Sequence, residues 1–185
     1  EVRVVVQEKT LVGYVQYNGT NVCFDSDGIV LEMSETAPEG TVLVSGVSME
    51  EPVLYQKLSV SNTALLRTIL SVTKLLGESG LHVDSVEFDE NSNITAVLGS
   101  VRVELGQDEY LEEKVSNLTA IYPKVASLTG TLNMTAFTGR FEPVTFRTLD
   151  ESTVPVDSSN EAVADPATAA ADTGGEGQDT GNAGD

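Results

Sequence analysis

The chain has 185 residues, a single cysteine and a formal net charge of −19. All ten Lys and Arg residues lie between Arg3 and Arg147, whereas residues 150–185 carry nine acidic residues and no basic one. This distribution argues against nucleic acid and anionic lipid as partners, because both require clustered basic side chains. One cysteine excludes an internal disulfide, and the apolar runs are far shorter than the ~20 residues of a membrane helix.

The first part of the chain is rich in β-branched and aromatic residues, which predicts strands. Asn18-Gly19 and Asp27-Gly28 are typical of tight turns, since their second residue readily adopts positive φ. Strands are predicted at residues 2–8 and 12–17, as a hairpin over residues 22–31, and at residues 42–44.

The spacing of apolar residues changes to that of a helix from Ser61 onward. Ser61 or Asn62 is placed to cap this helix, and Gly77 is expected to end it. Its apolar stripe is formed by Leu65, Leu66, Ile69, Leu70 and Leu76.

Alternation then returns, which predicts an antiparallel meander with one solvent-exposed face. Its strands are expected around residues 86–88, 94–98 and 101–105.

A second helix is predicted to begin near Asp108, whose carboxylate is placed to cap it. Pro123 is expected to kink or end this helix, because proline has no N–H. Its apolar stripe is formed by Leu111, Val115, Leu118, Tyr122 and Val125.

Two further strands are predicted at residues 131–137 and 144–148. The element order indicates an α+β fold, in which two helices pack on a mainly antiparallel β-sheet. Residues 150–185 hold few branched aliphatic residues and no aromatic one, which predicts a disordered acidic tail.

Three stretches carry a family resemblance through their order and spacing. The first is Val4-Val5-Val6-Gln7-Glu8-Lys9 followed by Val12-Gly13-Tyr14-Val15, Asn18-Gly19 and Phe24-Asp25-Ser26-Asp27-Gly28-Ile29-Val30-Leu31. The second is Val103-Glu104-Leu105-Gly106 with a helix that reaches Tyr122-Pro123, and the third is Gly130-Thr131-Leu132-Asn133-Met134. Together they resemble the extracytoplasmic part of the FtsQ/DivIB cell-division proteins, over roughly residues 1–149.

The resemblance implies a domain organisation and a role. Residues 1–17 would be the last strand of a preceding POTRA domain, residues 18–149 the family's β domain, and residues 150–185 the tail. The protein would be a non-enzymatic assembly factor of the divisome. It would act at the extracytoplasmic face of the bacterial membrane, at the division septum, and be held there by a single-pass anchor outside this chain.

The last predicted strand is expected to form a sheet edge, because Pro143 directly precedes it. A free edge is a template for a partner strand. The resemblance implies that the partners are FtsB- or DivIC-like and FtsL-like proteins, and through them the septal peptidoglycan synthase. Phe146 and Val144 are expected to fill pockets of the partner. The predicted docking residues are Phe137, Arg140, Val144, Thr145, Phe146 and Arg147.

Catalytic and metal chemistry finds little support in the sequence. His82 is the only histidine and is interpreted as a loop or capping residue, and Cys23 as a half-buried structural thiol. Asp25-Ser26-Asp27-Gly28 begins like a calcium loop, but residue 36 is Thr where such a loop needs Glu. This segment and residues 89–93 are therefore interpreted as turns, and no catalytic residue, metal site or cofactor is predicted.

Two other classes of function remain open at this point. One is a secreted or surface-attached adhesive or calcium-binding module, and the other, more remote, is a hydrolase.

Overall fold

The structure is a computed structural model that describes residues 9–139, 144–148 and 153–156. The strand predicted over residues 2–8 lies outside these residues. The described part forms one ten-stranded sheet, with the spatial order β10-β9-β8-β7-β6-β5-β4-β1-β2-β3, and two helices. The predicted α+β class is confirmed.

The first half of the sheet follows the predicted strands closely. The strands are β1 (Leu11–Tyr17), β2 (Thr20–Asp25), β3 (Val30–Ser34) and β4 (Val42–Ser45). Both predicted turns contain a positive-φ glycine, Gly19 and Gly28. β1 lies inside the sheet, between β2 and β4, so residues 11–17 of the segment assigned by resemblance to a preceding domain pair with the strands that follow them.

The second half of the sheet comprises β5 (Ser85–Phe88), β6 (Ile94–Leu98), β7 (Val101–Gly106), β8 (Gly130–Asn133), β9 (Val144–Thr148) and β10 (Thr153–Val156). The predicted meander of β5, β6 and β7 is confirmed. β8 is shorter than the predicted strand, because the chain turns at residues 135–136.

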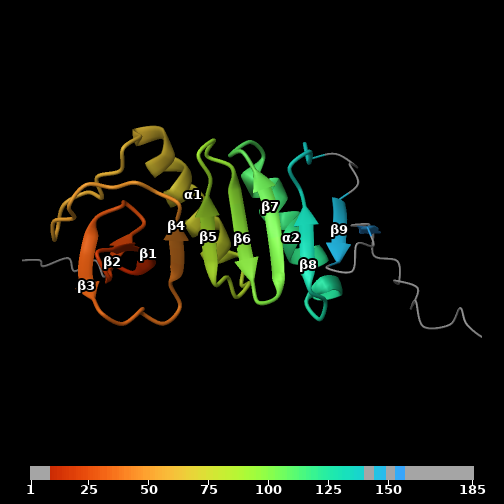
Figure 1. The fold of residues 1–185 in the computed structure, drawn as a ribbon, viewed down its shortest axis with the longest axis horizontal. Helices are drawn as coiled ribbons and strands as arrows, with labels where there is room; N and C mark the ends of the chain where they lie inside the picture. Colours follow the sequence, from red (N-terminus) through yellow and green to blue (C-terminus); the bar gives the residue numbers. More distant parts are fainter. Residues whose placement is uncertain (1–8, 140–143, 149–152, 157–185) are drawn as a thin grey trace, which may run out of the picture.

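Two helices connect parallel neighbouring strands. α1 (Thr63–Glu78) joins β4 to β5, and α2 (Leu111–Val125) joins β7 to β8. Crossovers of one hand place both helices on the same face of the sheet, where they contact each other (Figure 1). The pairs β1–β4, β4–β5 and β7–β8 are parallel, so the sheet is mixed although mostly antiparallel.

The helix termini differ in part from the predictions. Asn62 caps α1 as expected, by accepting a hydrogen bond from the N–H of Ala64 (2.9 Å), but the helix continues through Gly77 to Glu78. α2 begins at Leu111 and runs through Pro123. Pro123 is exposed near the end of α2. Because proline has no N–H, the carbonyl one turn earlier in the helix loses its usual donor, and water can take that place.

The core lies between the helices and the covered face of the sheet. Buried side chains alternate along β5, β6, β7 and β8, as expected for strands with one buried face. Along β5, β6 and β7 the alternate residues, which include Glu87, Thr95 and Arg102, are half-buried or exposed, which confirms the predicted solvent-exposed face of the meander.

Candidate functional site

The end of the sheet near the C-terminus holds the predicted docking strand, β9. β9 pairs with β8 on one side and with β10 on the other, both antiparallel. The prediction that residues 144–148 form a free edge is therefore wrong, and the edge strand is β10. The prediction that disorder begins at residue 150 is also wrong for residues 153–156, because these residues pair with β9 (Figure 1).

The direction of the main-chain groups in this region follows from two hydrogen bonds between β7 and β8. The N–H of Gly130 donates to the Ser100 carbonyl (3.2 Å), and the N–H of Met134 donates to the Glu104 carbonyl (2.9 Å). Main-chain groups alternate in direction along a strand. Even-numbered residues of β8 therefore face β7, and odd-numbered residues face β9.

The same alternation continues into β9. Thr131 lies opposite Arg147 and Asn133 lies opposite Thr145, and these pairs direct their main-chain groups toward each other. The N–H and C=O groups of the intervening Phe146 point the other way, toward β10. The side of β9 that was predicted to be free is thus occupied by the chain itself.

The two predicted apolar anchors are buried in the protein's own core. Val144 is 2% exposed and Phe146 is fully buried. These side chains cannot fill pockets of a partner while β9 keeps this orientation, so that part of the prediction is wrong. Their role in this structure is to attach β9 to the core.

Thr145 and Arg147 lie on the open face of the sheet. Thr145 is half-buried and Arg147 is exposed. They line a small polar hollow of about 110 Å³, together with Glu104, Thr131 and Asn133. The Asn133 side-chain amide donates to the Glu104 carboxylate (2.8 Å), which orders the floor of the hollow. A guanidinium and a hydroxyl beside the last strands can bind an acidic or polar segment.

Phe137 lines a different hollow from Thr145 and Arg147. Phe137 follows β8 in a loop, where its N–H donates to the Met134 carbonyl (3.1 Å), and its half-buried ring packs against the core. It lines a shallow hollow beside the outer side of α2, with Glu113 and Ser116. Arg140 lies outside the described residues.

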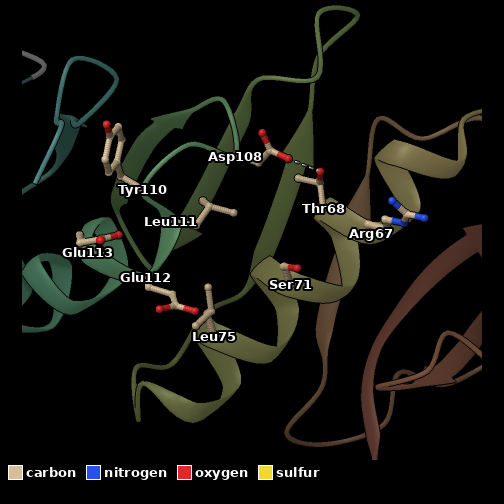
Figure 2. Close-up of a pocket in the computed structure, with 9 residues that line it drawn as sticks. All are labelled: Arg67, Thr68, Ser71, Leu75, Asp108, Tyr110, Leu111, Glu112 and Glu113. Atoms are coloured by element: carbon tan, nitrogen blue, oxygen red, sulfur yellow. Dashed lines mark hydrogen bonds between the residues drawn. The ribbon is translucent and has the colours of Figure 1, made fainter.

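A groove between α1 and α2 was not predicted from the sequence. Its volume is about 310 Å³, and Arg67 and Tyr110 lie at its opposite ends (Figure 2). The Thr68 hydroxyl donates to Asp108 across the two segments (2.9 Å), so Asp108 joins the helices instead of capping α2. The cap position is taken by Tyr110 in a left-handed conformation. The remaining lining residues are Ser71, Leu75, Leu111, Glu112 and Glu113.

Lys114 is a second feature that the sequence did not indicate, since it lies beside the apolar stripe of α2. It is 2% exposed, and its Nζ donates to the carbonyls of Leu105 (2.6 Å) and Gln107 (3.2 Å). Burial lowers the pKa of this ammonium, while the nearby Glu109 and Asp108 carboxylates oppose that shift. Lys114 ties the start of α2 to the end of β7.

The residues considered for calcium serve their own turns. The Asp25 carboxylate accepts the N–H groups of Asp27 and Ile29 (both 2.9 Å) and the ammonium of Lys9 (2.5 Å). Asp89 likewise accepts hydrogen bonds from the residues of its own turn. Within residues 9–139, 144–148 and 153–156, no group of three or more His, Cys, Asp or Glu side chains is arranged to hold a metal ion.

The two residues considered for catalysis lie far from a catalytic arrangement. His82 is in a loop with its side chain 92% exposed, 3.6 Å from the Asp84 carboxylate. Cys23 is fully buried, more so than predicted, and burial raises the pKa of its thiol, with a smaller contribution from Glu32. A thiol of this kind is a poor nucleophile.

These features describe a class of protein before they describe a family. The described residues form an α+β domain with both helices on one face of a mostly antiparallel sheet and with β10 at the edge of that sheet. The family model that matches the chain is that of the C-terminal part of the cell division protein FtsQ/DivIB, over residues 13–137. The chain belongs to the FtsQ/DivIB family, which acts at the division site and is non-enzymatic.

The matched region ends before the last strands of the sheet. It spans β1 to the loop that contains Phe137, so β9 and β10 lie beyond it. None of the curated proteins compared with the chain matches it. In the part of the chain that the structure describes, no helix is long and apolar enough to cross a membrane.

Proposed function

We propose that this chain is a non-enzymatic scaffold of the divisome that binds FtsB- or DivIC-like and FtsL-like partners at the C-terminal end of its sheet. Through these partners it regulates the septal peptidoglycan synthase. It works at the extracytoplasmic face of the membrane, where a membrane-spanning segment of the whole protein holds it. Family membership supports the cell-division role.

The observation that carries the proposal is the exposed Arg147 beside the last strands of the sheet. It lies with Thr145 on the open face, next to the polar hollow whose floor is formed by Asn133 and Glu104. Main-chain pairing at a strand edge supplies affinity, and neighbouring side chains select the partner. In an otherwise acidic chain, Arg147 favours an acidic side chain of the partner at this position.

The experiment is a titration of the 185-residue chain with the ectodomain of the FtsB- or DivIC-like protein from the same genome. Arg147→Glu is expected to weaken binding by about tenfold, because it replaces an attraction with a repulsion at the interface. The melting temperature of the variant is measured in parallel, so that a folding defect is recognised.

Arg67→Glu is the matched control, since it makes the same charge change on α1, within the helical groove. This variant should bind like the unmodified chain. If Arg67→Glu weakens binding and Arg147→Glu does not, the partner binds at the groove between the helices. If the ectodomain binds neither the unmodified chain nor a variant in which β10 no longer pairs with β9, the proposed partner is wrong.

A further inference from the structure

Among the residues that the structure describes, no strand pairs with the outer edge of β10, and this edge contains a proline at a position that matters for pairing. Pro155 lies opposite Thr145, and Val154 lies opposite Phe146. Because the main-chain groups of Phe146 face β10, those of Val154 face β9 in return. The main-chain groups of the alternate residues, Thr153 and Pro155, therefore point away from the sheet.

This arrangement makes the outer edge of β10 a poor template for the pairing of a further strand. Proline has no N–H, so the outward-facing position of Pro155 offers only a carbonyl. Natural sheets use proline in this way to discourage the addition of another strand. Among the described residues of β10, Thr153 presents an outward N–H and Pro155 does not.

The edge of β9 underneath β10 is the better template. Residues 144–148 contain no proline, and the N–H and C=O groups of Val144 and Phe146 both face this edge. Their side chains are anchored in the core, which fixes the position of the strand. A strand that reached this edge would find complete donors and acceptors in a rigid arrangement.

We propose that β10 occupies the position of a partner strand, and that the partner binds by replacing β10 against β9. The inference rests on the proposed function and specifies how the docking edge is regulated. The displaced segment is short, four residues from Thr153 to Val156. Its register places valines opposite Val144 and Phe146, so the partner is an extended segment with branched aliphatic residues at alternate positions and no proline.

A protein whose binding-competent state is only partly populated binds with an affinity reduced by that fraction. Weakening the pairing between β10 and β9 therefore strengthens partner binding. The alternative, in which a partner strand adds outside β10, predicts the opposite, because it needs β10 in place.

Two proline substitutions in the full chain separate these mechanisms, with the partner ectodomain named above as the probe. Val154→Pro removes an N–H that faces β9, whereas Thr153→Pro removes an N–H that faces outward. Replacement of β10 predicts about tenfold tighter binding for Val154→Pro and unchanged binding for Thr153→Pro. Weaker binding for both variants would overturn the proposal in favour of addition outside β10.

A reversible cross-link provides a second measurement in a single variant. Thr145 and Pro155 lie directly opposite each other as a non-hydrogen-bonded pair, whose Cα separation of about 4.5 Å is within the range for a disulfide. The double variant Thr145→Cys, Pro155→Cys should lose at least about tenfold in affinity when oxidised and recover it when reduced. The native Cys23 is fully buried and so protected from mispairing.

The two hypotheses fail in distinguishable ways. If the oxidised and reduced forms bind equally and Val154→Pro binds like the unmodified chain, β10 is not exchanged, and the proposed function stands without it. If neither the unmodified chain nor Val154→Pro binds the ectodomain, the proposed function is wrong, and this inference is wrong with it.

Discussion

Gly130 and Phe146 lie so close across β8 and β9 that a Cβ atom on Gly130 would come within 2.9 Å of the Phe146 ring and 2.3 Å of the Arg147 carbonyl. The second contact involves the main chain, which cannot move aside without displacing β9. We expect Gly130→Ala to lower the free energy of unfolding by about 1–3 kcal/mol, as overpacking does in well-packed cores. Urea denaturation measures this change.

Gly77→Ala is the control for Gly130→Ala. Gly77 lies inside α1, and a Cβ atom there meets nothing within 4 Å. This variant should stabilise the protein by about 0.5–1 kcal/mol, because alanine loses less conformational entropy in a helix than glycine does. Equal effects of both variants would contradict the close approach described for Gly130.

Phe146→Ala should act first on the stability of the fold. The ring is fully buried against the core, so its loss leaves a cavity and should cost about 3–5 kcal/mol of unfolding free energy. Thermal denaturation with and without the partner ectodomain separates the two roles. A variant that keeps its melting temperature but loses affinity would show that Phe146 contacts the partner.

Lys114 is expected to tolerate loss of its charge better than loss of its side chain. Lys114→Ala leaves the carbonyls of Leu105 and Gln107 without their donor and removes buried packing, at a cost of about 1–3 kcal/mol. Lys114→Met keeps most of the packing and should cost less. The unfolding free energies of both variants at pH 7 provide the comparison.

The pH dependence of stability tests the buried position of Lys114. Because burial lowers the pKa of this ammonium in the folded protein, the unfolded chain binds the proton more tightly. The unmodified protein should therefore gain stability relative to Lys114→Met as the pH rises toward the unfolded pKa of about 10.4. A difference between the two proteins that stays constant from pH 7 to pH 10 would contradict this.

Asp25 should contribute to acid denaturation. Burial alone would raise the pKa of its carboxyl, but hydrogen bonds from Lys9, Ile29 and Asp27 outweigh burial and hold the pKa below its usual value. A lowered pKa stabilises the fold above the unfolded pKa of about 3.9, and this stabilisation is lost as the pH falls through the folded pKa.

Two substitutions of Asp25 divide its contributions. Asp25→Asn keeps an oxygen for the two turn N–H groups but removes the charge, so the stability of this variant should fall less steeply below pH 4. Asp25→Ala leaves those N–H groups without an acceptor and should cost about 1–3 kcal/mol at pH 7. An unchanged acid transition in Asp25→Asn would contradict a paired carboxylate.

Local sequence patterns predicted most of the helices, strands and turns, because the formation of these elements depends largely on residues that are neighbours in the chain. Asn62 has an oxygen that reaches the N–H of Ala64, and Gly19 and Gly28 adopt the positive φ that their turns need. The helix termini were less predictable. α1 continues through Gly77 to Glu78, and Asp108 accepts a hydrogen bond from Thr68, forty positions away, instead of capping α2.

The docking residues were likewise predicted only in part. The residues of the segment 144–148 correctly predicted a strand, but the free edge inferred from Pro143 was wrong. Which edge of β9 is free depends on its pairing with residues 153–156. The sequence around these residues is polar and has the composition of a disordered tail. A strand of four residues with a proline has little propensity of its own, so its existence depends on the neighbour with which it pairs.

The fold class, the order of the elements, the turn residues and the family resemblance follow from periodicity, composition and spacing along the chain. The inward orientation of Phe146 and Val144, the burial of Lys114 and the pairing of β10 with β9 are visible only in the folded molecule. These features depend on contacts between segments distant in sequence. The energy of such contacts arises when both partners are brought together and is not contained in either segment alone.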